Sequence, residues 1–295
     1  MYYDDKTVIF LDGEFVKANE SNADLYSQTL HYGYGVFEGI RAYQTINGVK
    51  IFKAMEHFLR LKKSCELVGI PFTYDVEELI QLSYQVLEKN NLTNAYIRPL
   101  VFAGQNMALD HPKDISLMIC AWEWSKYHGD KPLKVCLSSY ERPNPKSTKI
   151  EAKVCGHYIN SILATTEAKN RGYGEALLLD MNGNVAEAPG ANFFYEKDGI
   201  LYTPPLGHIL PGITRETVIN ICQELDIPVV EEFFTPDVLN DADSAFLCGT
   251  AAEVVGIESL DAKPFPKEWS QSLGAVIQDA YKCAVLEKSF SYVII

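Results

Sequence analysis

Residues 151–158 read EAKVCGHY and place a lysine, Lys153, among small and apolar neighbours. A lysine amine attacks a carbonyl only in its neutral form, which burial beside other cations favours. Gly156 follows three positions later and permits close approach of another segment, because it has no side chain. Most lysines are exposed surface residues, so Lys153 is a candidate nucleophile only in combination with the motifs that follow it.

A carboxylate follows in residues 185–194, VAEAPGANFF, where Glu187 stands among small residues. An ordinary turn glutamate is the commoner outcome for such a residue. A carboxylate that is fixed close to a heterocyclic nitrogen would instead keep that nitrogen protonated by a charged hydrogen bond. Glu187 is therefore a candidate partner of Lys153 in the same chemistry.

Three places suit a phosphate group. Residues 210–215, LPGITR, open a helix whose first free amides belong to Ile213 and Thr214. A second glycine turn, GTAAE at 249–253, offers the Gly249 amide and the Thr250 hydroxyl. Arg60, within HFLRL at 57–61, supplies a full charge for bidentate contact, although helix-surface arginines are the commoner case.

The composition is that of an ordinary globular protein of 295 residues with a net charge of -13. This length is enough for two domains, and the negative charge argues against nucleic acid and anionic membranes as partners. The N-terminus shows no signal sequence, and no apolar run is long enough to cross a bilayer. Seven cysteines without a CxxC pair indicate reduced thiols and a cytoplasmic location. No metal site is predicted.

The first part of the chain is predicted to form hairpins, two helices and two long strands. The hairpins turn at Asp12-Gly13 and Asn47-Gly48. The expected helices cover residues 54–68, ending at Gly69, and a segment that begins at the N-cap Asp75. The expected strands cover residues 95–103 and 116–124.

The second part is predicted to alternate strands and helices. Strands are expected at 133–139, 176–179, 229–233 and 244–248, with a hairpin around Asp198-Gly199. Helices are expected at about 157–170, 213–225 and 268–286. Several hairpins among these elements argue against a doubly wound parallel sheet. The polar residues 125–132 are interpreted as a linker between an N-terminal α/β domain, 1–124, and a C-terminal α/β domain, 133–295, which carries Lys153.

Two further stretches complete the pattern: LHYGYGVFEGIRAY at 30–43 and AYIRPL at 95–100. In order and spacing, the motifs from Val8 to past Glu253 resemble the fold-type IV pyridoxal-phosphate enzymes, and among them the branched-chain amino-acid aminotransferases. The resemblance implies a mixed α/β (α+β) fold of two domains with pyridoxal 5'-phosphate (PLP) in the interdomain cleft. It also implies transamination between leucine, isoleucine or valine and 2-oxoglutarate by a homodimer or higher homo-oligomer. Its partners would be small amino acids and 2-oxo acids.

The resemblance assigns residue roles. Lys153 would be the catalytic residue, which forms the Schiff base with PLP and moves a proton. The residues implied to bind the cofactor are Arg60, Lys153, Tyr158, Glu187, Ile213, Thr214, Gly249 and Thr250. Those implied to bind the substrate are Tyr32, Phe37, Arg41, Tyr96, Arg98, Trp124, Tyr127, Thr250 and Ala251. Among these, Arg98 would hold the distal carboxylate of glutamate, and Tyr32 would help to close the site of the neighbouring subunit.

Other functions agree less well with these motifs. A D-amino-acid aminotransferase or an aminodeoxychorismate lyase of the same fold is the nearest alternative, and the motifs FEGIR at 37–41 and YIR at 96–98 argue against both. A non-catalytic PLP-binding protein could dispense with Lys153 or Glu187, and both are present. A phosphate-binding hydrolase is disfavoured because no nucleophile-elbow motif occurs.

Overall fold

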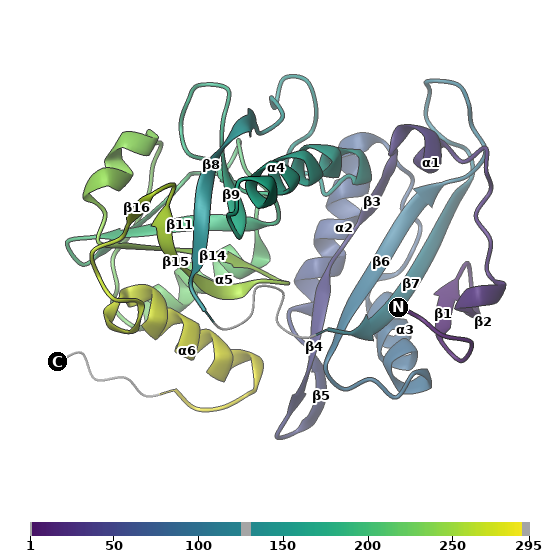
Figure 1. Cartoon of the computed structure of the whole chain (residues 1–295). Helices are drawn as coiled ribbons and strands as arrows, with labels where there is room; N and C mark the ends of the chain where they lie inside the picture. The colour runs from purple at the N-terminus through teal and green to yellow at the C-terminus, as the bar shows by residue number, and fades with distance from the viewer. Residues whose placement is uncertain (1, 125–130, 291–295) are drawn as a thin grey trace. The chain divides into compact units, whose positions relative to one another are not determined.

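The computed structural model describes residues 2–124 and 131–290, and its chain forms two compact units (Figure 1). Unit 1 comprises Met1–Ser125 and Ala152–His157, and unit 2 comprises Lys126–Glu151 and Tyr158–Ile295. Most of the predicted linker, residues 125–130, lies outside the described residues. Lys153 was predicted to lie in the C-terminal domain. The segment Ala152–His157, which contains Lys153, belongs instead to unit 1.

Unit 1 contains an antiparallel sheet, in which seven strands are described, with the order β2-β1-β7-β6-β4-β5 and with β3 paired to β6. In chain order these strands are β1 (Val8–Leu11), β2 (Glu14–Lys17), β3 (Gly35–Phe37), β4 (Ile40–Thr45), β5 (Gly48–Ile51), β6 (Ala95–Ala103) and β7 (Ile115–Glu123). The two long strands β6 and β7 lie side by side at its centre (Figure 1). The sheet therefore gives unit 1 a rigid base on which short segments can be positioned.

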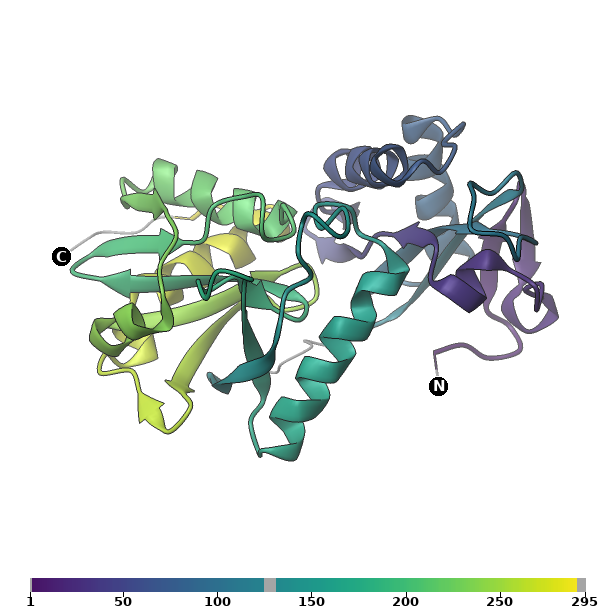
Figure 2. The same cartoon turned by 90° about the horizontal axis from the view of Figure 1, so that it is seen from above.

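Helices α2 (Ala54–Val68) and α3 (Val76–Lys89) pack together against this sheet (Figure 2). Their apolar sides, including Phe58, Leu61 and Leu79, join sheet residues in one buried cluster. Helix α2 ends at Gly69 in the left-handed conformation, and Asp75 caps α3 by accepting a hydrogen bond from the Glu78 amide. Helix α2 begins and ends as predicted, and α3 begins as predicted, since the caps concerned are local in sequence.

The hairpin turns of unit 1 illustrate how register depends on side chains. The first hairpin turns at Asp12-Gly13 as predicted, with Leu11 opposite Glu14. The second pairs Thr45 with Gly48, so its two turn residues are Ile46 and Asn47, one position earlier than expected. The Thr45 hydroxyl accepts the Asn47 amide at 3.0 Å, and Gly48 has a φ of 100° that favours glycine.

The segment Ala152–His157 is held in unit 1 by backbone contacts. Val154 forms an antiparallel bridge with Val36, and the Phe37 amide donates to the Lys153 carbonyl at 3.1 Å. The Gly156 amide donates to the Gly33 carbonyl at 3.0 Å. A Cβ added at Gly33 would lie 2.6 Å from the Cα of Gly156, so the close approach predicted for Gly156 is confirmed. These distant contacts explain why the segment departs from the predicted domain boundary.

Unit 2 contains a mixed sheet, in which nine strands are described, with the order β13-β12-β11-β14-β15-β8-β9. Strand β10 pairs with β11, and β16 pairs with β15. The strands are β8 (Leu133–Glu141), β9 (Glu175–Leu179), β10 (Glu187–Ala188), β11 (Ala191–Lys197), β12 (Ile200–Thr203), β13 (Val229–Glu231), β14 (Ser244–Gly249), β15 (Glu253–Leu260) and β16 (Lys263–Pro264). Only the pairs β8–β9, β8–β15 and β12–β13 are parallel within the described sheet, so it is not doubly wound.

Three helices pack on the sheet of unit 2. Helix α4 (Tyr158–Asn170) lies along β8 and β9, and Figure 2 shows its length from above. Helices α5 (Ile213–Glu224) and α6 (Leu273–Val285) contact each other and β14. Their positions agree with the predicted segments within a few residues. None of the helices in the described part of the chain is both long and apolar enough to span a membrane.

Short elements were not predicted. These are helix α1 (Gln28–Tyr32), strands β3, β10, β15 and β16, and the 3-10 turns at Ala18–Glu20, Cys155–His157, Pro236–Asp241 and Trp269–Gln271. Most of them lack the periodicity that identifies an element from sequence. Strand β15 is longer, with eight residues, and it was missed because its first residue was interpreted as part of a phosphate-binding turn.

Candidate active site

Lys153 is positioned from two sides within unit 1. Its backbone carbonyl accepts from Phe37 at the end of β3, and its amide donates to the Ser64 hydroxyl on α2 at 3.1 Å. Its Nζ lies 5.2 Å from the centroid of the Phe37 ring. The lysine side chain is thus half-buried over an aromatic ring, on a backbone tied to a strand and a helix.

A series of contacts runs from Phe37 to two further predicted substrate residues. The Arg98 guanidinium lies 4.5 Å from the Phe37 ring centroid and 5.4 Å from that of Tyr96. Tyr96 in turn lies 5.0 Å from Trp124, measured between ring centroids. The Nε of Arg98 is buried with no hydrogen-bond partner among the described residues. Unit 1 therefore brings together the lysine, a cation and apolar aromatic surface.

Tyr96 also explains a glycine in the FEGIR motif. A Cβ added at Gly39 would lie 1.7 Å from the Tyr96 hydroxyl, so only glycine leaves room for this ring. Tyr96 stands opposite Arg41 in the β4–β6 register. Arg41 is buried, and its guanidinium lies 5.2 Å from the centroid of the Tyr43 ring. The tight packing fixes the direction of the Tyr96 hydroxyl.

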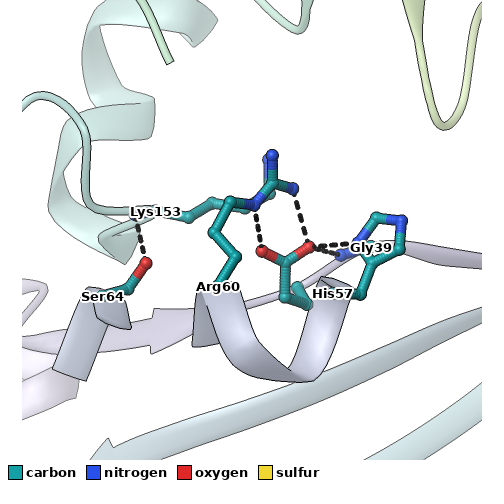
Figure 3. A network of polar contacts seen from close by, with 6 residues as sticks. Gly39, His57, Arg60, Ser64 and Lys153 are labelled. Atoms are coloured by element: carbon teal, nitrogen blue, oxygen red, sulfur yellow. Dashed lines mark hydrogen bonds and ion pairs between the residues drawn. The ribbon is translucent and has the colours of Figure 1, made fainter. Parts of the chain in front are cut away.

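Arg60, predicted to bind phosphate, takes part in a buried polar network (Figure 3). Its Nε and Nη2 donate to the two oxygens of Glu38 at 2.6 and 2.9 Å. His57, one turn earlier on α2, is joined through Nδ1 to the same carboxylate at 2.7 Å. The figure shows His57, Arg60 and Ser64 along one side of the helix, with Ser64 bonded to Lys153.

The electrostatics of this network follow from burial and pairing. Burial alone would raise the pKa of Glu38, but the Arg60 guanidinium and the His57 hydrogen bond outweigh it and hold that pKa well below its usual range. Burial lowers the pKa of His57 and outweighs the attraction of Glu38. The network therefore consists of an ionised Glu38, a cationic Arg60 and a neutral His57.

One predicted substrate residue, Tyr32, lies outside this series of contacts. Tyr32 ends α1, is 47% exposed, and donates its hydroxyl to the Met107 carbonyl at 3.2 Å. Tyr127 lies outside the described residues.

Cys155 is partly buried, and burial, offset in part by Arg98, raises its pKa to about 11. Its thiol is therefore a poor nucleophile at neutral pH.

Unit 2 contains the predicted carboxylate. Glu187 in β10 is buried, forms an ion pair with the Arg142 guanidinium at 2.9 Å and accepts a hydrogen bond from the Asn192 side chain at 3.0 Å. The backbone amide of Leu210 donates to it at 3.1 Å. One guanidinium, one amide side chain and one backbone amide suit an ionised acceptor whose direction is fixed.

The Asn192 side chain connects Glu187 with the start of α5. Its Nδ2 also donates to the Leu210 carbonyl at 3.1 Å, and a Cβ added at Gly212 would lie 1.9 Å from its Oδ1. Gly212 is the N-cap of α5 and has no side chain to bond the first helical amides. The amides of Ile213 and Thr214 therefore keep the anion-binding character of a helix start.

The second predicted glycine turn joins β14 to β15. Gly249 pairs with Glu253, and residues 250–252 form the turn that contains Thr250 and Ala251. A Cβ added at Gly249 would lie 3.0 Å from the Gly190 carbonyl oxygen, so glycine allows these two backbone segments to pack closely. Tyr158 is the first residue of α4 in the same unit and is half-buried. The cofactor position in an interdomain cleft stays a prediction.

Comparison with known proteins decides the family. Residues 35–260 match the model of amino-transferase class IV. A branched-chain-amino-acid aminotransferase of Salmonella typhimurium is 39% identical over 261 residues, which cover 86% of this chain and 84% of the relative. The chain belongs to the class IV aminotransferases.

Solved structures agree with this family. The crystal structure of the Escherichia coli branched-chain amino acid aminotransferase matches this aminotransferase with a TM-score of 0.94 and 35% identity, over 97% of this chain and 96% of that one. The branched-chain amino acid aminotransferase from Thermobaculum terrenum, in its PLP-containing holo-form, matches with a TM-score of 0.90 and 30% identity, over 97% and 96%. The predicted mixed α/β fold of the fold-type IV enzymes is confirmed.

Sequence reasoning missed four residues that this aminotransferase places in contact with predicted ones. Glu38 accepts hydrogen bonds from Arg60 and from His57, and Arg142 pairs with Glu187. Trp122 packs against both Tyr96 and Arg98. Trp122 follows from the β6–β7 register opposite Tyr96, which a predicted antiparallel pair would have offered. The other three act across elements distant in sequence, for which no local pattern exists.

Among the described residues, no group of three or more His, Cys, Asp or Glu side chains could hold a metal ion.

Proposed function

We propose that this protein transfers the amino group of leucine, isoleucine or valine to 2-oxoglutarate with PLP as cofactor, giving branched 2-oxo acids and L-glutamate. The observation that carries the proposal is the contact series from the Lys153 amine to the Phe37 ring and the Arg98 guanidinium. It combines a nucleophilic amine with an apolar wall and a cation. Such a combination suits substrates that are aliphatic in one half-reaction and acidic in the other.

The residues fit PLP in three respects. The uncapped start of α5 and the close-packed Gly249 turn suit a phosphate, with Ile213, Thr214 and Thr250 as donors. The Arg60 guanidinium adds a positive charge, and Glu187 offers a fixed anion to a protonated ring nitrogen. Tyr158 and Lys153 complete the proposed cofactor-binding set.

When bound, PLP accepts the electrons released as the substrate Cα loses its proton. In this chain, the Lys153 Nζ would hold the cofactor and, once the substrate amine has displaced it, would be free to take the Cα proton and return it. Its backbone is held by Phe37 and Ser64, which limits the directions open to the amine. Lys153 is therefore the proposed catalytic residue.

Glu187 would hold a proton on the cofactor ring. Its two oxygens are fixed by Arg142, Asn192 and Leu210, so it needs little rearrangement when the ring binds. Asn192 also supports the glycine that precedes α5. We infer that Asn192 thereby fixes two groups relative to each other. These are the Glu187 carboxylate, which would pair with the cofactor ring, and the amides at the start of α5, which would bind its phosphate.

Substrate binding is assigned to the aromatic and basic residues. Phe37, Tyr96 and Trp124 supply apolar surface, with Tyr32, Tyr127 and Arg41 as further proposed contacts. The buried Nε of Arg98 supports its role as partner of the distal carboxylate of glutamate. Thr250 and Ala251, in the turn after β14, would hold the α-carboxylate with the Tyr96 hydroxyl.

A panel of amino donors with 2-oxoglutarate tests this function. We expect the branched-chain L-amino acids to give the highest kcat/KM and D-amino acids to give little product. D-alanine or D-leucine turnover equal to that of L-leucine would instead favour the D-amino-acid aminotransferase alternative. Conversion of aminodeoxychorismate without amino transfer would favour the lyase.

We further propose a cytoplasmic homodimer or higher homo-oligomer in which Tyr32 helps to close the partner's site. The hydrogen bond from Tyr32 to Met107 joins the end of α1 to a loop of unit 1, and this region exposes apolar side chains, among them Leu25, Leu30 and Leu109. Exposed aromatic and aliphatic residues of this kind support a subunit interface. The cysteines, all free thiols, support a reducing compartment.

A further inference from the structure

Glu38 is fully buried between β3 and β4, and its carboxylate accepts four hydrogen bonds. Oε1 accepts from the Arg60 Nε, and Oε2 accepts from the Arg60 Nη2, the His57 Nδ1 and the Gly39 amide, the last at 3.2 Å. Three of these four donors converge on Oε2 and one lies on Oε1, so the carboxylate is held from several sides. Glu38 therefore acts on its neighbours in unit 1, and a direct contact with a ligand is not needed to explain its burial.

The geometry of the pair determines which way Arg60 points. Glu38 engages the side of the guanidinium formed by Nε and Nη2. The end formed by Nη1 and Nη2 is then directed away from Glu38 and has the spacing for a bidentate contact with an oxyanion. An arginine side chain otherwise samples many rotamers, and fixing it in the folded protein removes that entropic cost from ligand binding.

His57 holds the carboxylate in turn. An ionised carboxylate only accepts hydrogen bonds, so the Nδ1 of His57 must be the donor. Because burial keeps His57 neutral, it fixes Glu38 without adding a charge next to Arg60. His57 and Arg60 are three positions apart on α2 and so lie on the same side of the helix (Figure 3).

We propose that Glu38, fixed by His57, is a positioning residue that aims the Arg60 guanidinium at the phosphate of PLP. This inference rests on the proposed function, in which Arg60 binds that phosphate. It assigns a role in cofactor affinity to two buried residues that do not touch the reacting atoms.

The test measures dissociation constants of the apoprotein for PLP and for pyridoxal, which lacks the phosphate. Glu38→Gln replaces one acceptor oxygen with a donor amide and so breaks part of the network. We expect the Kd for PLP to rise about 10- to 150-fold, the range for a lost charged hydrogen bond, while that for pyridoxal changes little. Glu56→Gln is the matched control, because Glu56 lies on the same helix and pairs with the nearby Lys53 at 2.8 Å; both constants should stay at wild-type values.

His57 variants keep the test decisive if Glu38→Gln folds poorly. His57→Leu removes the donor and should weaken PLP binding selectively, whereas His57→Asn retains an N–H donor and should restore most of the affinity. Equal weakening for PLP and pyridoxal, or a lowered melting temperature with unchanged PLP affinity, would indicate a merely structural role and overturn the inference.

A double variant separates this inference from the proposed function. If Glu38 acts through Arg60, then Glu38→Gln should add little to the PLP affinity loss of Arg60→Ala. Wild-type PLP affinity in Arg60→Ala would overturn the phosphate role of Arg60 itself. A large loss of PLP affinity in Arg60→Ala, together with wild-type PLP affinity in Glu38→Gln, would overturn only the positioning role of Glu38.

Discussion

At the scale of single residues, the fixed carboxylate of Glu187 carries a clear energetic consequence. Its three donors point at an anion, and an amide in its place would turn one acceptor oxygen into a donor that faces Arg142 or Asn192. The proposed hydrogen bond to the protonated cofactor ring would be lost as well. A charged hydrogen bond of this kind stabilises by about 1.5–3 kcal/mol.

Glu187→Gln should therefore retain some cofactor but slow removal of the substrate Cα proton by about 10- to 150-fold. The measurement is the single-turnover rate with L-leucine at saturating cofactor. Glu141→Gln is a suitable control, since this neighbour of Arg142 is exposed at the end of β8. A wild-type rate in Glu187→Gln would remove Glu187 from the proposed role.

Arg98 offers a second prediction at the scale of single residues. Of the two amino donors glutamate and leucine, only glutamate has a distal carboxylate. Arg98→Ala should lower kcat/KM for glutamate about 10- to 150-fold more than for leucine, the range for a lost charged hydrogen bond. The ratio of kcat/KM for the two donors is the quantity to measure. Equal losses for both would make Arg98 a support for Phe37 and Tyr96 and not a carboxylate ligand.

At the scale of elements, α2 is both a packing helix and a carrier of polar groups. One side inserts Phe58 and Leu61 into the core, and another presents His57, Arg60 and Ser64 to β3 and to the lysine segment. A neutral, buried histidine in this helix couples stability to pH. In the folded state burial lowers the pKa of His57, while the unfolded chain protonates it near its ordinary pKa of 6.5.

The sign of this coupling follows from proton uptake. Below about pH 6.5 the unfolded state binds a proton that the folded state does not, so stability falls as the pH is lowered and is fully present above that value. The melting temperature of His57→Asn should therefore fall less steeply than that of the wild type between about pH 7.5 and 5.5. Parallel curves for wild type and His57→Asn would show that folding leaves the pKa of His57 unchanged, and a steeper fall for His57→Asn would show that folding raises it; either would contradict this prediction.

The elements also show what sequence alone can predict. Helices α2 and α3 were predicted with their caps, because Gly69 and Asp75 act within one turn of the residues they cap. The three-residue strand β3 was missed, since it is too short for a periodic pattern. The Asn47-Gly48 turn was misplaced by one residue, because the Thr45 hydroxyl selected the register.

The candidate site divides in the same way. Lys153, Glu187 and Arg98 were proposed from motifs, and the structure gives each of them neighbours that support its proposed role. Glu38 and Arg142 were not proposed, because their partners lie 22 and 45 residues away. Such contacts depend on tertiary folding, which also moved Lys153 from its predicted domain into unit 1.

At the scale of the whole molecule, the proposed dimer makes sites that two chains share. A mixture of Lys153→Ala protomers with protomers carrying Tyr32→Ala should form heterodimers in which one site has both residues intact. The mixture should then show more activity than either parent after confirmed subunit exchange. Absence of recovery, or full activity of a monomer at assay dilution, would refute the shared site.

The central claim is that Lys153 and PLP exchange the amino group of a branched-chain L-amino acid. The most direct measurement mixes cofactor-loaded protein with L-leucine, without a 2-oxo acid, and follows the visible absorbance of the bound cofactor. We predict a rapid change that 2-oxoglutarate reverses as glutamate forms, and no such change with D-leucine or in Lys153→Ala. A wild-type response from Lys153→Ala, or a response to D-leucine but not L-leucine, would contradict the account.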